Sequence, residues 1–64
     1  MEHQIVVGNI GSVYVGNVRK RAGEIFKLYV GYSKDFVGRA AGEAVTWVVN
    51  GEMYKEYFPP EENE

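Results

Sequence analysis

EAVTWVVNGEMYKEYF, residues 43–58, is the stretch that decides the fold. Two runs rich in β-branched and aromatic residues flank the pair Asn50-Gly51. Asn and Gly tolerate the positive φ angles that a type I′ turn demands, so the stretch predicts a β-hairpin with a two-residue loop. We expect its strands over residues 43–49 and 52–58.

The two-residue loop fixes which residues of this hairpin lie opposite each other. It predicts that Val49 pairs with Glu52, Val48 with Met53, Trp47 with Tyr54, Thr46 with Lys55 and Val45 with Glu56. One face then carries the side chains that a helix should cover, namely Val45, Trp47, Val49, Tyr54 and Phe58. The opposite face is more apolar than a fully solvated face, and we expect it to form an interface through Val48, Met53 and Tyr57.

Upstream of the hairpin, apolar residues recur with the period of an α-helix. Six fall within one stripe at 100° per residue: Ala22, Ile25, Phe26, Tyr29, Tyr32 and Phe36. Asn17 is a typical N-cap residue, so the helix is predicted to begin near Val18 and to end between Ser33 and Gly38. On its outer side, a basic line recurs every seven residues at Lys20, Lys27 and Lys34.

The start of the chain predicts another hairpin. Ile5-Val6-Val7 is a β-branched run, Gly8-Asn9-Ile10-Gly11 closes it, and residues 12–15 follow as a second strand. The element order is therefore β-β-α-β-β. It predicts an α+β fold, a four-stranded and mainly antiparallel sheet with one helix on one face.

Sixty-four residues without cysteine suffice for one small domain, which we place at residues 1–58, followed by a disordered acidic tail at 59–64. A chain of this length buries only about 60% of its unfolded surface, so a homo-oligomer is expected to extend the core. Met1-Glu2-His3 lacks the basic start of a signal peptide, and no apolar run approaches the length of a membrane span. These features predict a cytoplasmic protein.

The net charge of −2 conceals a segregation along the chain. Residues 19–39 hold six basic and two acidic residues, whereas residues 40–64 hold one lysine and six glutamates. This pattern fits an anionic partner, and equally a solvated helix face beside the protein's own acidic hairpin. Nucleic acid is a disfavoured partner because the domain is acidic overall.

The segment from 33 to 43 is the candidate ligand site. Its small residues let the backbone approach a ligand, and Arg39 offers a planar fork of donors to phosphate or carboxylate. The candidate ligand-binding residues are Ser33, Lys34, Gly38, Arg39, Gly42 and Glu43. The alternative is structural: the glycines form turns, and Arg39 pairs with Glu43 or with a neighbouring subunit.

Catalytic and metal-binding constellations are not evident in the sequence. His3 is the one imidazole and cysteine is absent, so one chain cannot assemble a zinc site or a Ser-His arrangement. Nothing pairs Glu43, Glu52 or Glu56 into a general acid and a base. We therefore expect a non-enzymatic protein without metal or cofactor.

Several short motifs carry a family resemblance: Gly8-Asn9-Ile10-Gly11, Tyr29-Val30 with Ser33-Lys34, Gly38-Arg39-Ala40 with Gly42-Glu43 and Val45-Thr46, and Gly51-Glu52. In this order and spacing the chain resembles a group of short uncharacterised proteins encoded in tailed-phage and prophage genomes. The resemblance covers residues 8–58, with departures at Trp47-Val48-Val49 and Tyr57-Phe58. It implies an accessory protein that acts by binding, either by sequestering a host nucleotide signal or by occupying a host protein.

Two functions follow as hypotheses. The first is an oligomeric binding protein that holds an anionic small ligand, such as a nucleotide, at the 33–43 loop and blocks a host defence signal. The second is a protein-interaction module that contacts a host or phage protein through the second sheet face, Val48, Met53 and Tyr57. A membrane partner is not expected from either hypothesis.

Overall fold

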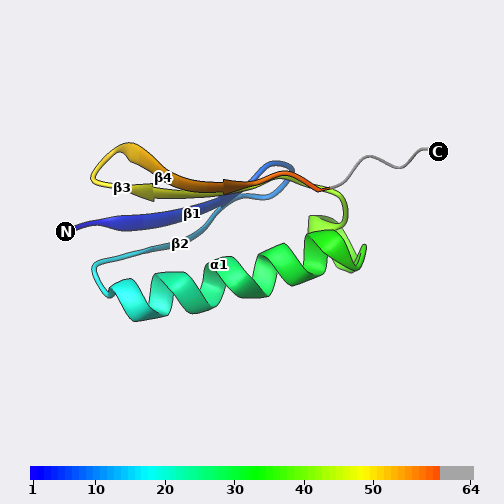
Figure 1. Cartoon of the computed structure of the whole chain (residues 1–64), viewed down its shortest axis with the longest axis horizontal. Helices are drawn as coiled ribbons and strands as arrows, with labels where there is room; N and C mark the ends of the chain where they lie inside the picture. Colours follow the sequence, from blue (N-terminus) through cyan, green and yellow to red (C-terminus); the bar gives the residue numbers. More distant parts are fainter. Residues whose placement is uncertain (60–64) are drawn as a thin grey trace.

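The predicted α+β architecture is confirmed by a computed structural model, which describes residues 1–59 (Figure 1). The elements follow in the expected order: β1 (His3–Val7), β2 (Gly11–Gly16), α1 (Arg19–Lys34), a short 3₁₀ helix η1 (Gly38–Ala40), β3 (Val45–Val49) and β4 (Glu52–Tyr57). The disordered tail predicted for 59–64 lies outside the described residues, apart from Pro59.

The sheet joins two hairpins through their inner strands. Its strand order is β2-β1-β3-β4, and every neighbouring pair is antiparallel. Asn50 and Gly51 have φ angles of 53° and 83°, which confirms the turn that joins β3 to β4. Asn50 also ties this turn to the start of the chain, since its Oδ1 accepts a hydrogen bond from the Glu2 amide at 2.9 Å.

The core lies between the sheet and α1, which runs along one face of the sheet (Figure 1). Alternate residues of the two central strands point into it, because successive side chains of a strand face opposite ways. The buried apolar residues are Ile5, Val7, Ala22, Ala40, Val45 and Trp47. Partly buried side chains of the helix, including Ile25, Phe26, Tyr29 and Val30, pack against this cluster.

Both ends of the helix differ in detail from the prediction. Asn17 is not the cap: Val18 occupies the N-cap position and makes no side-chain capping bond. The end falls within the predicted range, at Lys34, but Phe36 lies beyond it, with a φ of 57° and 56% of its surface exposed. The buried helix stripe therefore ends on Ser33 instead of Phe36.

The register of the second hairpin was predicted correctly only next to its turn. Val49 pairs with Glu52 and Val48 with Met53, but a bulge at Tyr54 then places Trp47 opposite Lys55. The bulge lets the Tyr54 ring stay against Trp47, with centroids 4.9 Å apart, while the rest of β4 advances by one residue.

This shift reverses the face on which the end of β4 displays its side chains. Tyr57 now pairs with Val45 and packs against the core, so its predicted place on the second sheet face was wrong. Phe58, expected under the helix, is 67% exposed. The aromatic side chain of Tyr57 gains apolar contacts by this change, which explains why the alternation breaks.

The open face of the sheet, opposite α1, is consequently more polar than predicted. The pairings line up two rows across the four strands: Val15, Gln4, Val48 and Met53 in one, and Ser12, Val6, Thr46 and Glu56 in the other. Hydrogen bonds run within the face, from Gln4 to Ser12 and from Thr46 to Glu56, both at 3.3 Å. We call the first set the apolar row and the second the polar row.

Candidate functional site

The predicted ligand loop is fastened to the end of α1. Ser33 is fully buried, and its hydroxyl donates to the Glu43 carbonyl at 2.6 Å. The Ser33 carbonyl accepts the Gly42 amide at 3.1 Å. Gly38 and Gly42 have φ angles of 62° and 72°, which favour glycine, so three of the six predicted residues shape the loop itself.

The charged side chains of the loop lie in different environments and do not form one cluster. Lys34 and Arg39 are exposed. The predicted ion pair between Arg39 and Glu43 does not form; within residues 1–59 the ion pair is Arg21 with Glu24, at 3.6 Å. Instead, Glu43 reaches the first hairpin, where its Oε1 lies 2.9 Å from the position that a Cβ on Gly8 would occupy. The loop thus leaves Arg39 exposed without gathering its other polar groups around it.

A groove lies elsewhere, between α1 and β4. The helix packs on β1, β2 and β3 and leaves β4 uncovered on the same side. The space beside the helix forms a first hollow of about 490 Å³. Its lining comes from three elements: Lys20, Gly23, Glu24, Phe26 and Lys27 of α1, Trp47 of β3 and Lys55 of β4.

The floor of this hollow is apolar and held in place. The Phe26 and Trp47 ring centroids lie 5.6 Å apart. The indole N–H of Trp47 donates to Nδ1 of the buried His3 at 3.2 Å, and Tyr54 packs edge-on against the indole. Gly23 adds no side chain, so the edge of the largely buried indole borders the hollow.

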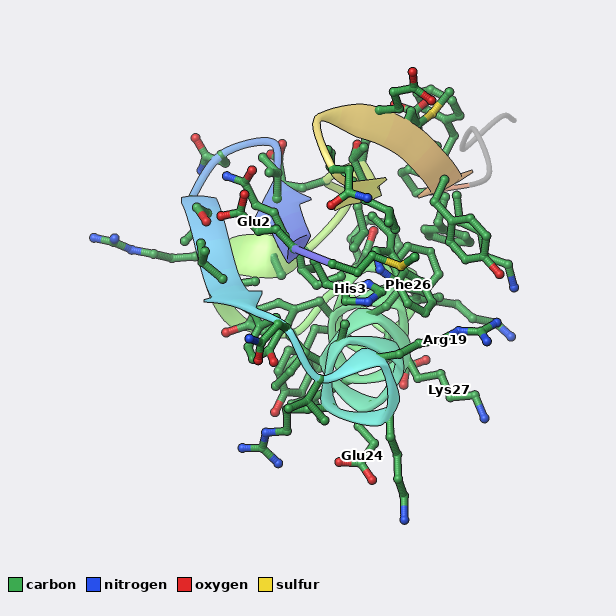
Figure 2. The ribbon with its side chains drawn as sticks, turned by 90° about the vertical axis from the view of Figure 1, so that its left-hand side faces the viewer. Glu2, His3, Arg19, Glu24, Phe26 and Lys27 are labelled. Atoms are coloured by element: carbon green, nitrogen blue, oxygen red, sulfur yellow. The ribbon has the colours of Figure 1, made fainter. Side chains whose placement is uncertain are left out.

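The rim of the hollow is positively charged. Lys20, Lys27 and Lys55 have no acidic partner within 4 Å among residues 1–59. Glu24 also borders the hollow, but its carboxylate pairs with Arg21. Figure 2 shows Arg19 and Lys27 extending to one side of the helix below β4, whereas Glu24 points away from the sheet.

A second hollow of about 250 Å³ lies nearer the chain start and is lined by Met1, His3, Arg19, Val49 and Tyr54. Arg19 Nη2 donates to the Tyr54 hydroxyl at 3.3 Å, so this contact crosses from helix to strand. We call the two hollows together the α1/β4 groove. It can hold a ligand that combines an apolar part with negative charge, since both kinds of contact are present.

Sequence reasoning found parts of this groove but did not join them. Lys20 and Lys27 stood out as a basic line, and Trp47 as a residue under the helix. Their meeting depends on α1 leaving β4 uncovered, and Lys55 enters only because of the bulge. Neither feature has a signal in the residue pattern.

Within residues 1–59, no three metal-ligating side chains cluster, and no helix is long and apolar enough to cross a bilayer. Comparisons with protein families, curated proteins and solved structures gave no significant match. The resemblance to phage and prophage proteins therefore stays a prediction.

Proposed function

We propose that this protein is a non-enzymatic binding protein that holds an anionic small ligand with a flat apolar part, such as a nucleotide, in the α1/β4 groove. The observation that carries this proposal is the ring of Lys20, Lys27 and Lys55 around the Trp47 and Phe26 floor. It replaces the 33–43 loop as the place where the ligand binds.

The groove suits such a ligand better than the loop does. Its first hollow has the volume of ordinary small-molecule sites, which run from about 300 to 1,000 Å³. Apolar contact with Phe26 and Trp47 removes surface from water, and the lysine ammonium groups neutralise the anion. At the loop, Arg39 is a single exposed cation, and the Ser33 hydroxyl is already bonded.

In a phage or prophage setting, the same site would serve to sequester a host nucleotide signal and so block a defence response. The protein would act by lowering the free concentration of the signal, which requires tight binding and no turnover. Support for this setting comes from the resemblance of the Gly38 to Thr46 segment.

Titration with AMP tests the proposal. Trp47 is the one tryptophan of the chain and lies on the groove floor, so its fluorescence reports binding directly. We expect Lys27→Glu to weaken AMP binding at least tenfold, since a charge-assisted contact contributes about 1.5–3 kcal/mol and each 1.4 kcal/mol is tenfold.

Two variants serve as controls for this titration. Lys34→Glu makes the same charge change on the same helix outside the hollows, and Arg39→Ala removes the cation of the loop. Both should bind AMP within about twofold of the wild type, and Arg39→Ala should melt at an unchanged temperature. Loss of binding in Arg39→Ala alone would return the site to the loop, and no AMP binding by the wild type would refute the proposal.

The second candidate function is contact with another protein through the open sheet face. The observation that favours it is the apolar row, whose outer residues Val15 and Met53 are 58% and 61% exposed, with Gln4 and Val48 between them. We propose a second copy of this chain as the occupant, because identical apolar rows can pack against each other about a two-fold axis.

A further inference from the structure

The second hollow of the groove is too small to be a site by itself. Its volume of about 250 Å³ falls below the range of about 300–1,000 Å³ that small-molecule sites occupy. Like the first hollow, it combines a cation, on Arg19, with apolar or aromatic walls, at Met1, Val49 and Tyr54, and it also borders His3. This likeness indicates an extension of the first hollow.

The two hollows are lined by neighbouring residues of the same three elements. On the helix the lining passes from Arg19 to Lys20, and on β4 from Tyr54 to Lys55. On β3 it passes from Val49 to Trp47. Arg19 of the second hollow and Lys20 of the first are consecutive, so the two hollows are neighbours, and we call the boundary between them the junction.

The contact between Arg19 and Tyr54, which lies in the second hollow beside this junction, is weak. At 3.3 Å it is longer than the usual range of N–H···O bonds, and both side chains are exposed. An anion at the junction offers the Arg19 guanidinium a stronger, charge-assisted partner than a neutral hydroxyl. Arg19 can thus exchange the Tyr54 hydroxyl for a phosphate at small cost.

We infer that the ligand of the groove is a dinucleotide, with one base in each hollow and the linking phosphate at the junction beside Arg19 and Lys20. This inference rests on the proposed function and narrows its ligand class. Two neighbouring hollows, each with an apolar or aromatic wall and with a basic residue next to the other hollow, match two flat rings joined by an anion.

An extended peptide is a poorer match to the same surface. A peptide strand would pair with the free edge of β4, but that strand carries a bulge and Lys55, two features that oppose strand addition. The site therefore favours a compact ligand.

The test compares adenylyl-adenosine (ApA) with AMP. ApA has one negative charge, on its phosphodiester, and the phosphate monoester of AMP has a larger negative charge. Tighter binding of ApA would therefore show a contribution from the second base and not from charge. We expect wild-type protein to bind ApA at least tenfold more tightly than AMP. Trp47 fluorescence and calorimetry measure both affinities. Equal affinities would overturn the inference and leave the proposed function standing, whereas binding of neither would refute both.

Substitutions at the junction sharpen this comparison. Arg19→Gln should weaken ApA about tenfold and change AMP less than twofold, and Arg39→Gln, outside both hollows, should change neither. Tyr54→Phe keeps the ring and releases Arg19, so it should bind ApA as tightly as the wild type or up to fivefold more tightly. A tenfold loss in Tyr54→Phe would contradict the exchange of partners by Arg19.

A longer strand provides the last arm of the test. If the groove were part of a track for single-stranded nucleic acid, a ten-nucleotide adenylate strand would bind more than tenfold tighter than ApA at the same salt. A dinucleotide site predicts a difference below that limit. Thermal melts of every variant confirm that a loss of affinity is not a loss of fold.

Discussion

His3 illustrates how one residue serves the core and the groove together. The residue is 3% exposed, and its Nδ1 accepts the hydrogen bond from the Trp47 indole. The contact joins β1 to β3 and orients the indole that forms the groove floor. An imidazole that is the only one in the chain thus has a structural role in this fold.

Removal of that acceptor should destabilise the protein. In His3→Leu the buried Trp47 N–H loses its partner, which costs about 1–3 kcal/mol of unfolding free energy. His3→Gln supplies a carbonyl oxygen to the same donor and should lose clearly less. Urea denaturation followed by Trp47 fluorescence measures both variants, and equal losses would show that ring packing matters more than the hydrogen bond.

Two positions of α1 carry glycine, although alanine would make the helix more stable, and one of them borders the groove. Gly23 and Gly31 both lie inside α1, where glycine is less favourable than alanine by about 0.8–1.0 kcal/mol. A Cβ on Gly23 would lie 3.5 Å from the Trp47 ring, an ordinary contact, and a Cβ on Gly31 would meet nothing within 4 Å. Space for alanine therefore exists at both positions.

The two alanine substitutions should separate stability from binding. Gly23→Ala and Gly31→Ala should each raise the unfolding free energy by roughly 0.5–1 kcal/mol. Gly23→Ala also puts a methyl group on the floor of the first hollow and should weaken AMP binding, whereas Gly31→Ala should leave it unchanged. If both variants bound AMP like the wild type, the floor at Gly23 would not contact the ligand.

The helix and the strands could be predicted from the sequence where a local pattern of residues determines them. The Asn50-Gly51 turn and the helical stripe each have a local physical cause, and with the first hairpin they predict the observed α+β architecture, although not the strand order β2-β1-β3-β4. The bulge at Tyr54 has no such local cause in the sequence pattern: it keeps the Tyr54 ring against Trp47 and also brings Tyr57 opposite Val45, and both contacts form only in the folded sheet. Everything that depends on the bulge, including the face of Tyr57, was therefore mispredicted.

The candidate site was predictable to a smaller extent. The 33–43 loop was predicted as the ligand site because its glycines and Arg39 lie close together in the sequence. Its conformation is instead explained by the two hydrogen bonds that Ser33 makes, with Glu43 and with Gly42. The groove draws Lys27, Trp47 and Lys55 from separate elements. They come together only because the helix packs over β1, β2 and β3 and leaves β4 uncovered, which is a property of the folded core.

For the molecule as a whole, one helix cannot cover both faces of the sheet. The covered face contains the core and the groove, and the open face contains the apolar and polar rows. At about 4.8 Å between strands and 3.4 Å per residue, four strands of five residues present a face of roughly 300 Å². This is small beside the roughly 800 Å² per partner of standard interfaces, so an association through it should be weak.

We therefore expect a homodimer that forms through the apolar row and dissociates as the protein is diluted into the low micromolar range. Met53→Lys places like charges against each other across the two-fold axis and should give a monomer at every concentration. Ser12→Lys, an equal charge change in the polar row of the same face, should keep the dimer. Sedimentation equilibrium from about 5 to 500 µM measures all three proteins, with thermal melts to verify folding. A wild type that stays monomeric throughout, or a Ser12→Lys variant that dissociates as fully as Met53→Lys, would contradict packing through this row, because only the apolar side chains gain free energy by leaving water.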